Sequence, residues 1–263
     1  MVTLLFLPAA EASAEQALGR VTGRIDCQSV AGCPGVAALW PADKKIVPAP
    51  DRYVLVPALM SALQPDGSFE LIAPVGEYYI GVQLRKTPGP LFGSPRVGDQ
   101  IYLMQKQDET GYRVTVKKDQ VTDIGLHSKA WTFAGLTTLP EMGVRGQVID
   151  INKHPVAGLL VFAFADPGAR TTPLAVSSRT GKDGSFVLPL ATSGAVYLRA
   201  RKNYRGGKPE LNDYIGAAEN APQPVVVAPG RLTTEVIISV RKLSSVLRRK
   251  NAPGPTSPKP GKR

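Results

Sequence analysis

Short runs of alternating apolar and polar residues recur along most of the chain. In the run 21–26 (VTGRID), every second residue is apolar or glycine and the residues between them are polar. A period of two is typical of a strand with one buried face and one wet face. Many glycines and prolines lie between such runs, which is how short strands are usually separated. The pattern therefore predicts an all-β protein.

The apolar runs place fourteen strands in two sets of seven. In the first set we expect strands near 20–26, 35–40, 58–64, 68–73, 78–84, 112–118 and 120–126. In the second set we expect them near 143–149, 158–164, 174–180, 185–190, 195–201, 224–228 and 232–242. Seven short strands separated by turn residues are typical of a β-sandwich.

One tetrad, Asp-Gly-Ser-Phe, occurs at 66–69 and again at 183–186, each time in the middle of a set. A period above 100 residues indicates two domains and not a solenoid of short repeats. We therefore expect two tandem seven-stranded β-sandwich modules of Greek-key type, at 20–127 and 143–243. Residues 128–142 are the expected linker, and its aromatic residues Trp131 and Phe133 predict that it packs against a module.

Each tetrad has the sequence of a tight turn followed by a return strand. Glycine tolerates positive φ, so we expect structural turns at Asp66-Gly67 and at Asp183-Gly184. The phenylalanine that ends each tetrad should then point inward. Neither pair lies in a series of acidic ligands, so we predict turns and no metal site.

The repeated motifs resemble those of the carboxypeptidase regulatory-like domain, a prealbumin-like (transthyretin-like) β-sandwich family. The resemblance rests on an opening V-x-G-x-[VI]-x-D, a Pro-Gly or Pro-x-x-Gly step before the second strand, and the D-G-S-F tetrad. The matching residues are Val21, Gly23, Ile25, Asp26, Pro34 and Gly35 in the first copy, and Val144, Gly146, Val148, Asp150, Pro155 and Gly158 in the second, besides the tetrads. The resemblance implies accessory modules used for spacing, docking or ligand contact. A fold by itself does not supply the function.

The net charge of +11 is concentrated at the C-terminal end. Beyond Val240 there are eight basic residues and no acidic ones, and the residues before them carry a net charge of only +3. This distribution argues against a nucleic-acid-binding protein. Residues 244–263 are rich in proline and basic residues and contain little to bury, so we expect a disordered tail. The tail is either a solubilising extension or a contact for an acidic surface.

The N-terminus has the composition of an export signal. An apolar run at 2–10 precedes Ala12-Ser13-Ala14, which fits a small-x-small cleavage pattern, so we interpret 1–14 as an N-terminally incomplete signal peptide. The alternative is a buried N-terminal strand. The run is too short to span a bilayer. We therefore expect an exported protein, periplasmic or extracellular, that does not span the membrane.

Two cysteines, Cys27 and Cys33, lie six residues apart in the first module. Export would place them where disulfides persist, so we predict a local disulfide. Two free thiols are the alternative.

No catalytic pattern emerges from the residues that usually carry chemistry. Of the two histidines, His127 falls at the boundary between the first module and the linker and His154 falls in a turn, and neither lies in a Ser-His-Asp or Cys-His pattern. No metal-ligand spacing of the H-E-x-x-H kind and no phosphate-binding glycine loop occurs. We therefore expect no enzymatic activity and no cofactor.

A long insertion precedes the last two strands of each module, at 86–111 and at 203–221. Long loops on a rigid sandwich are often functional. The candidate binding residues are Arg96, Asp99, Tyr102, Tyr204, Arg205, Asp213 and Tyr214. Tyrosine and arginine suit binding because they combine a large contact area with directional polar ends. The expected partner is an envelope or extracellular protein, or a glycan if the tyrosines form a carbohydrate-binding surface. Alternatively, each loop packs over its own sandwich with its Asp and Tyr hydrogen-bonded internally.

Overall fold

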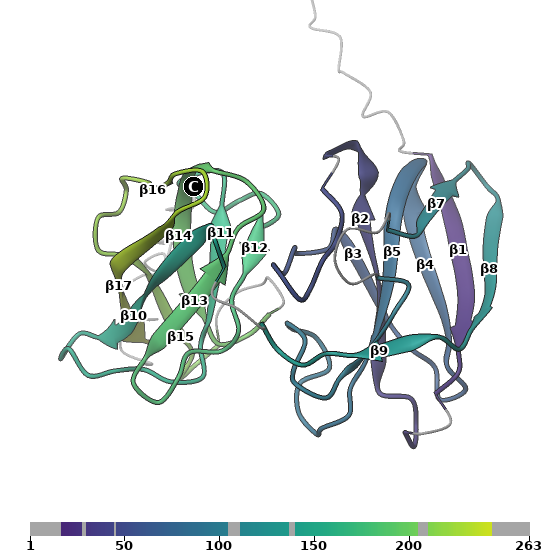
Figure 1. Ribbon diagram of the computed structural model, residues 1–263, viewed down its shortest axis with the longest axis horizontal. Helices are drawn as coiled ribbons and strands as arrows, with labels where there is room; N and C mark the ends of the chain where they lie inside the picture. Colours follow the sequence, from purple (N-terminus) through teal and green to yellow (C-terminus); the bar gives the residue numbers. More distant parts are fainter. Residues whose placement is uncertain are drawn as a thin grey trace, which may run out of the picture.

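The computed structural model describes residues 17–27, 30–44, 46–104, 111–136, 140–204 and 210–243. It is an all-β structure, which confirms the predicted class. The strands form two units that lie side by side (Figure 1). The N-terminal unit contains β1–β9 and the C-terminal unit contains β10–β17. The expected signal peptide at 1–14 and the expected tail at 244–263 lie outside the described residues.

The N-terminal unit consists of two sheets that face each other. Its strands are β1 (Leu18–Ile25), β2 (Gly35–Pro41), β3 (Leu59–Ala62), β4 (Ser68–Pro74), β5 (Gly76–Leu84), β6 (Gln100–Tyr102), β7 (Arg113–Val116), β8 (Val121–His127) and β9 (Ala130–Thr132). One sheet has the order β4-β1-β8; the other has the order β3-β2-β5-β6-β9, with β7 also paired to β5. A short 3-10 turn, η1 (Ala42–Lys44), follows β2.

The C-terminal unit is one sheet that closes over its own core. Its strands are β10 (Gly143–Asp150), β11 (Leu160–Phe164), β12 (Ala175–Val176), β13 (Ser185–Pro189), β14 (Gly194–Arg201), β15 (Tyr214–Ala218), β16 (Val225–Val227) and β17 (Leu232–Lys242). The strand order is β12-β11-β14-β15-β17-β10-β13, with β16 also paired to β14. The strand β15 pairs with both β14 and β17, and so joins the two layers into one sheet.

The strand pairings of the two units correspond to one another. The antiparallel pair β1–β4 matches β10–β13, and the parallel pair β1–β8 matches β10–β17. Both parallel pairs contain a register shift, between Thr22 and Arg24 in one unit and between Val144 and Gly146 in the other. The long strand β17 corresponds to two separate strands of the first unit, β8 and β9, because β8 pairs with β1 while β9 pairs with β6. Shared pairings extend the repeat seen in the motifs to the order of the strands.

Each unit encloses its own apolar core. In the N-terminal unit, buried side chains from β1 and β4 meet those from β2 and β5; among them are Val21, Leu71, Leu39 and Val82. In the C-terminal unit the equivalent cluster gathers around Val144, Leu188, Val161 and Leu198. Burial of such side chains is the main favourable term in folding.

The motif glycines make room for the phenylalanines of the tetrads. Gly23 is paired across the sheet with Phe69, and Gly146 with Phe186. Both rings are buried, as predicted. A Cβ atom at Gly23 would lie 2.7 Å from the Phe69 ring, and one at Gly146 would lie 3.0 Å from the Phe186 ring. The glycine of each opening motif and the phenylalanine of the following tetrad are therefore direct neighbours across the sheet.

The units contain more strands than the expected seven. The additional strands β6 and β15 lie inside the two long insertions, and β9 lies inside the expected linker. Because β9 pairs with β6 and Phe133 is buried beside it, this part of the expected linker packs on the N-terminal unit, as its aromatic residues predicted. These strands are only three to five residues long, too short to show a clear period in the sequence.

Candidate functional site at the seam between the two units

An extended segment, Tyr53–Pro57, lies between the outer faces of the two units and is here called the strap (Figure 1). Its side chains alternate between the two sides. Leu55 packs on the N-terminal unit in a cluster with Trp40, whereas Val54 and Val56 pack on the C-terminal unit in a cluster with Phe162. Alternation is what an extended backbone produces when both of its faces are covered.

Hydrogen bonds hold the strap on both sides. The Trp40 indole nitrogen donates to the Leu55 carbonyl at 3.1 Å. On the other side, the Val176 amide of β12 donates to the Val54 carbonyl at 3.1 Å. A buried backbone carbonyl that found no partner would carry a desolvation cost, so these bonds favour one position of the strap.

A second contact between the units comes from the first insertion. The Ser94 hydroxyl donates to the Ser177 carbonyl at 2.9 Å, and both residues are buried. The loop that carries Ser94 is organised by Arg85, whose guanidinium donates to the carbonyls of Leu91, Gly93 and Ser94. The contact between units therefore depends on a side chain that directly follows β5.

Arg85 is paired with Asp99 in the interior. The two side chains are 3% and 0% exposed, and their closest nitrogen and oxygen are 2.7 Å apart. Burial lowers the pKa of the Arg85 guanidinium, and the charge and hydrogen bond of Asp99 oppose that shift. The Asp99 carboxylate also accepts from Gln83 and from the amides of Lys86 and Arg96. A buried carboxylate needs such a set of donors.

A groove of about 490 Å³ runs beside the strap. Its walls are apolar side chains from both units together with two arginines and a tyrosine. It is lined by Val56, Pro57, Met60, Phe162, Phe164, Ala169, Arg170, Thr171, Pro173, Arg201 and Tyr204. This size falls in the range typical of small-molecule pockets.

In the first insertion, the candidate residues are used inside the N-terminal unit. Asp99 and Tyr102 are 0% and 2% exposed, so their side chains do not reach a partner at the surface. The Tyr102 hydroxyl donates to the Asp26 carbonyl at 2.7 Å, and this bond explains why the Tyr102 side chain points into the unit. The Arg96 guanidinium is half-buried and donates to the carbonyls of Thr87, Pro88 and Pro90. The predicted surface of Arg96, Asp99 and Tyr102 thus corresponds to internal contacts in this unit.

In the second insertion, the candidate residues do not lie together as one surface. Tyr204 packs on Phe162 at a ring-centroid distance of 5.9 Å, and burial raises the pKa of its hydroxyl. Tyr214 packs against the core of the C-terminal unit. The Asp213 carboxylate accepts from the Glu210 amide at 2.8 Å. Arg205 lies outside the described residues. Of this group, Tyr204 is the residue that the structure places in the groove.

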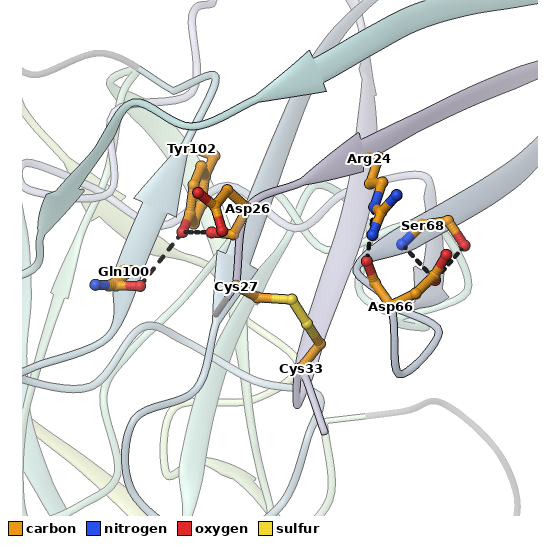
Figure 2. The surroundings of a disulfide bond; sticks show 8 residues. All are labelled: Arg24, Asp26, Cys27, Cys33, Asp66, Ser68, Gln100 and Tyr102. Atoms are coloured by element: carbon orange, nitrogen blue, oxygen red, sulfur yellow. Dashed lines mark hydrogen bonds between the residues drawn. A yellow bond between two sulfur atoms is a disulfide. The ribbon is translucent and has the colours of Figure 1, made fainter. Parts of the chain in front are cut away.

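The predicted disulfide is confirmed between Cys27 and Cys33, whose Cα atoms are 5.6 Å apart (Figure 2). It closes the connection between β1 and β2, next to the turn at Asp66 and Gly67. A Cβ atom at Gly67 would lie 3.0 Å from the Cys27 sulfur. The bond therefore joins two neighbouring pieces of the same unit and acts locally.

Both predicted Asp-Gly turns are confirmed. Gly67 and Gly184 have φ values of 83° and 74°, a region that glycine enters without strain. The Asp66 carboxylate accepts from the amide and hydroxyl of Ser68 at 3.0 and 2.7 Å (Figure 2), and these bonds lower its pKa. Asp183 makes the same bonds to Ser185, with the same effect on its pKa.

Within the described residues, the structure contains no group of three or more His, Cys, Asp or Glu side chains placed to hold a metal ion. The same residues include no helix of the length and apolarity needed to cross a membrane.

No family model matches the chain, and no curated protein matches it. Similar solved structures include the Bacillus anthracis TIE protein, at 9% identity and a TM-score of 0.25 over 86% of this chain and 34% of that one. The streptococcal ancillary pilin has 15% identity and a TM-score of 0.22 over 86% of this chain and 63% of that one. The group B streptococcus pilus 2b backbone protein has 10% identity and a TM-score of 0.23 over 91% of each chain. The chain thus spans about a third of the TIE protein structure. Similarities of this low degree carry no argument about the function of this chain.

The strap was not predicted from the sequence. Its residues are apolar at nearly every position and end in Pro57, so they lack the polar-apolar alternation of a half-exposed strand. The available signal was the run Val54-Leu55-Val56 itself, because three successive apolar residues outside a strand indicate a segment covered on both faces.

Proposed function

We propose that this chain is a non-catalytic exported scaffold or docking protein built from two tandem sandwich modules of the carboxypeptidase regulatory-like kind. The observation that carries the proposal is the strap, which is bonded to Trp40 on one unit and to Val176 on the other. Two units held in this way present one fixed surface to a partner. Inter-domain contacts of this kind limit the relative motion that linked domains otherwise show.

Export is supported by the disulfide. Disulfides persist in oxidising compartments such as the periplasm and the extracellular space, and are rare in the cytosol. The Cys27–Cys33 bond therefore favours one of these locations.

The carbohydrate-binding alternative needs the candidate tyrosines to present exposed rings, and their contacts do not support it. Tyr102 is buried, Tyr214 packs on the core, and Tyr204 is covered by Phe162. We therefore propose a protein partner in the envelope or outside the cell.

The test of the proposal measures the orientation of the units and the location of the protein. Spin labels at Lys117→Cys and Asn152→Cys, on exposed turns of the two units, should give one narrow distance distribution in the whole chain. Val56→Asp should broaden it, because a charge would then face Phe162 inside the seam. The untreated protein from its native host should be recovered from an exported fraction with no free thiol under denaturing conditions.

Two results would overturn the proposal. A broad distance distribution in the unsubstituted chain would show that the units move independently. Recovery from the cytosol with both cysteines free would remove the argument for export.

A further inference from the structure

The groove beside the strap has an apolar floor formed by both units. Phe162 and Phe164 project from the outer face of β11, and Val56 and Met60 approach them from the N-terminal unit. Tyr204 closes one side, with its ring against Phe162. An apolar group inside the groove would therefore be covered from both units.

The polar part of the groove carries only positive charge. Arg170 and Arg201 line it, and none of the lining residues that the structure describes is acidic. Among the residues that the structure describes, neither arginine forms an ion pair with a carboxylate. Arginine presents a planar fork of donors that matches carboxylate, sulfonate and phosphate groups. The charge of the groove is thus complementary to a single anionic head.

The two strands β11 and β14, which carry the aromatic floor and Arg201, offer a peptide no free backbone edge. The strand β11 is paired on both sides, with β12 and β14, and β14 is paired with β11 and β15. An extended peptide laid over these strands would find no free strand edge for its own amides and carbonyls. A compact ligand without a peptide backbone avoids that cost.

We propose that the groove binds a small amphipathic anion, with an aromatic or aliphatic body over Phe162 and Phe164 and one anionic head between Arg170 and Arg201. This role goes beyond scaffolding, because it assigns a ligand to the seam itself. The ligand would contact both units and would stabilise their association by mass action.

The test uses two fluorescent probes that differ only by one sulfonate group: 1-anilinonaphthalene-8-sulfonate and the neutral N-phenyl-1-naphthylamine. The whole chain should bind the sulfonate at one saturable site. Arg201→Gln should weaken that binding roughly tenfold or more, since a hydrogen bond to a charged group is lost. Arg201→Lys should retain part of the affinity. Arg145→Gln, on the exposed side of β10, is the matched control and should have no effect.

Two readouts place the bound sulfonate. The neutral probe should bind more weakly than the sulfonate and should not respond to Arg201→Gln. Amide chemical shifts should change at Thr171 and Tyr204, and not on the exposed apolar face that contains Ile72 and Val121. Urea unfolding of each variant confirms that the fold is retained.

Equal binding of the sulfonate by Arg201→Gln and the unsubstituted chain would overturn the proposal. Shift changes confined to Ile72 and Val121 would also overturn it, because they would show adsorption to a different surface. Failure of this ligand-binding test would not overturn the scaffold proposal, because that proposal depends only on the orientation of the units and on export.

Discussion

At the scale of single residues, the buried pair of Arg85 and Asp99 has a large expected effect on stability. Asp99→Asn removes the charge that compensates a guanidinium with 3% exposure. Breaking a buried pair from one side typically costs about 3–5 kcal/mol. We expect the free energy of unfolding in urea to fall by about that amount.

The control for this prediction is the exposed pair of Arg20 and Glu70, with closest atoms 3.2 Å apart. Exposed pairs contribute about 0–1 kcal/mol, so Glu70→Gln should change stability little. Equal losses in the two variants would contradict the argument from burial.

The Asp-Gly turns carry a residue-scale prediction about pH. Hydrogen bonds from Ser68 favour the charged form of Asp66, so its pKa in the folded state lies below its unfolded value. The turn therefore stabilises the folded state above the unfolded pKa of about 3.9. This contribution to stability is lost as the pH falls through the folded pKa. Carboxyl titration by NMR should show the Asp66 pKa rising in Ser68→Ala.

The second turn supplies the matched control, because Asp183 depends on Ser185 in the same way. Ser185→Ala should raise the pKa of Asp183 and leave that of Asp66 unchanged. Coupled changes at both carboxyls in either variant would contradict the local origin of the shift.

At the scale of elements, the strap determines how the units meet. Val56→Asp places a charge against the apolar face that contains Phe162. The strap should then separate from β12 more often, and the Val176 amide would lose its acceptor, the Val54 carbonyl. We expect hydrogen exchange at the Val176 amide to accelerate at least about tenfold, since an uncompensated buried charge costs well over 1.4 kcal/mol.

The control is Val226→Asp on β16, where the side chain is 66% exposed. A charge there meets water, so exchange at the Val176 amide should stay unchanged. If Val56→Asp also leaves that exchange rate unchanged, the strap does not hold the seam.

At the scale of the whole molecule, the limits of the N-terminal unit can be tested with fragments. A fragment of residues 17–136 contains β9 and should unfold in one cooperative transition. A fragment of residues 17–127 lacks β9, Trp131 and Phe133. Its free energy of unfolding should be lower by at least about 3 kcal/mol, the usual effect of removing a buried phenylalanine. Urea titration of both fragments measures the difference, and equal midpoints would show that β9 does not belong to the unit.

Much of the fold followed from local signals. Alternating runs predicted strands at positions that the structure occupies, such as β1 and β14, because a half-buried strand must alternate every second residue. The repeated tetrads predicted two turns of the same geometry. The insertions were harder to predict: the similar sequences at 98–102 and 212–216 lead into the equivalent strands β6 and β15. The tyrosine, arginine and aspartate residues of the two insertions indicated binding loops, although each insertion also contains a strand of its sheet.

The candidate site shows the limit of sequence reasoning most clearly. Tyrosine, arginine and aspartate in long loops are typical of binding surfaces, yet Asp99 and Tyr102 are inside the N-terminal unit. The partner of Tyr102 is a carbonyl 76 residues earlier in the chain. Residue type indicates which contacts a side chain can make, and does not indicate whether the protein or a ligand supplies the partner.

The sequence by itself determined the strand class, the repeat and the two turns, and it placed the two cysteines of the predicted disulfide six residues apart, because each of these features depends on residues close together in the chain or on a recurring pattern. Only the tertiary structure decided which side chains remain exposed and how the units meet. The seam joins Val54 to Val176 and Ser94 to Ser177. Such contacts form between segments far apart in sequence, where burial and hydrogen bonding on both sides select one arrangement that no local pattern encodes.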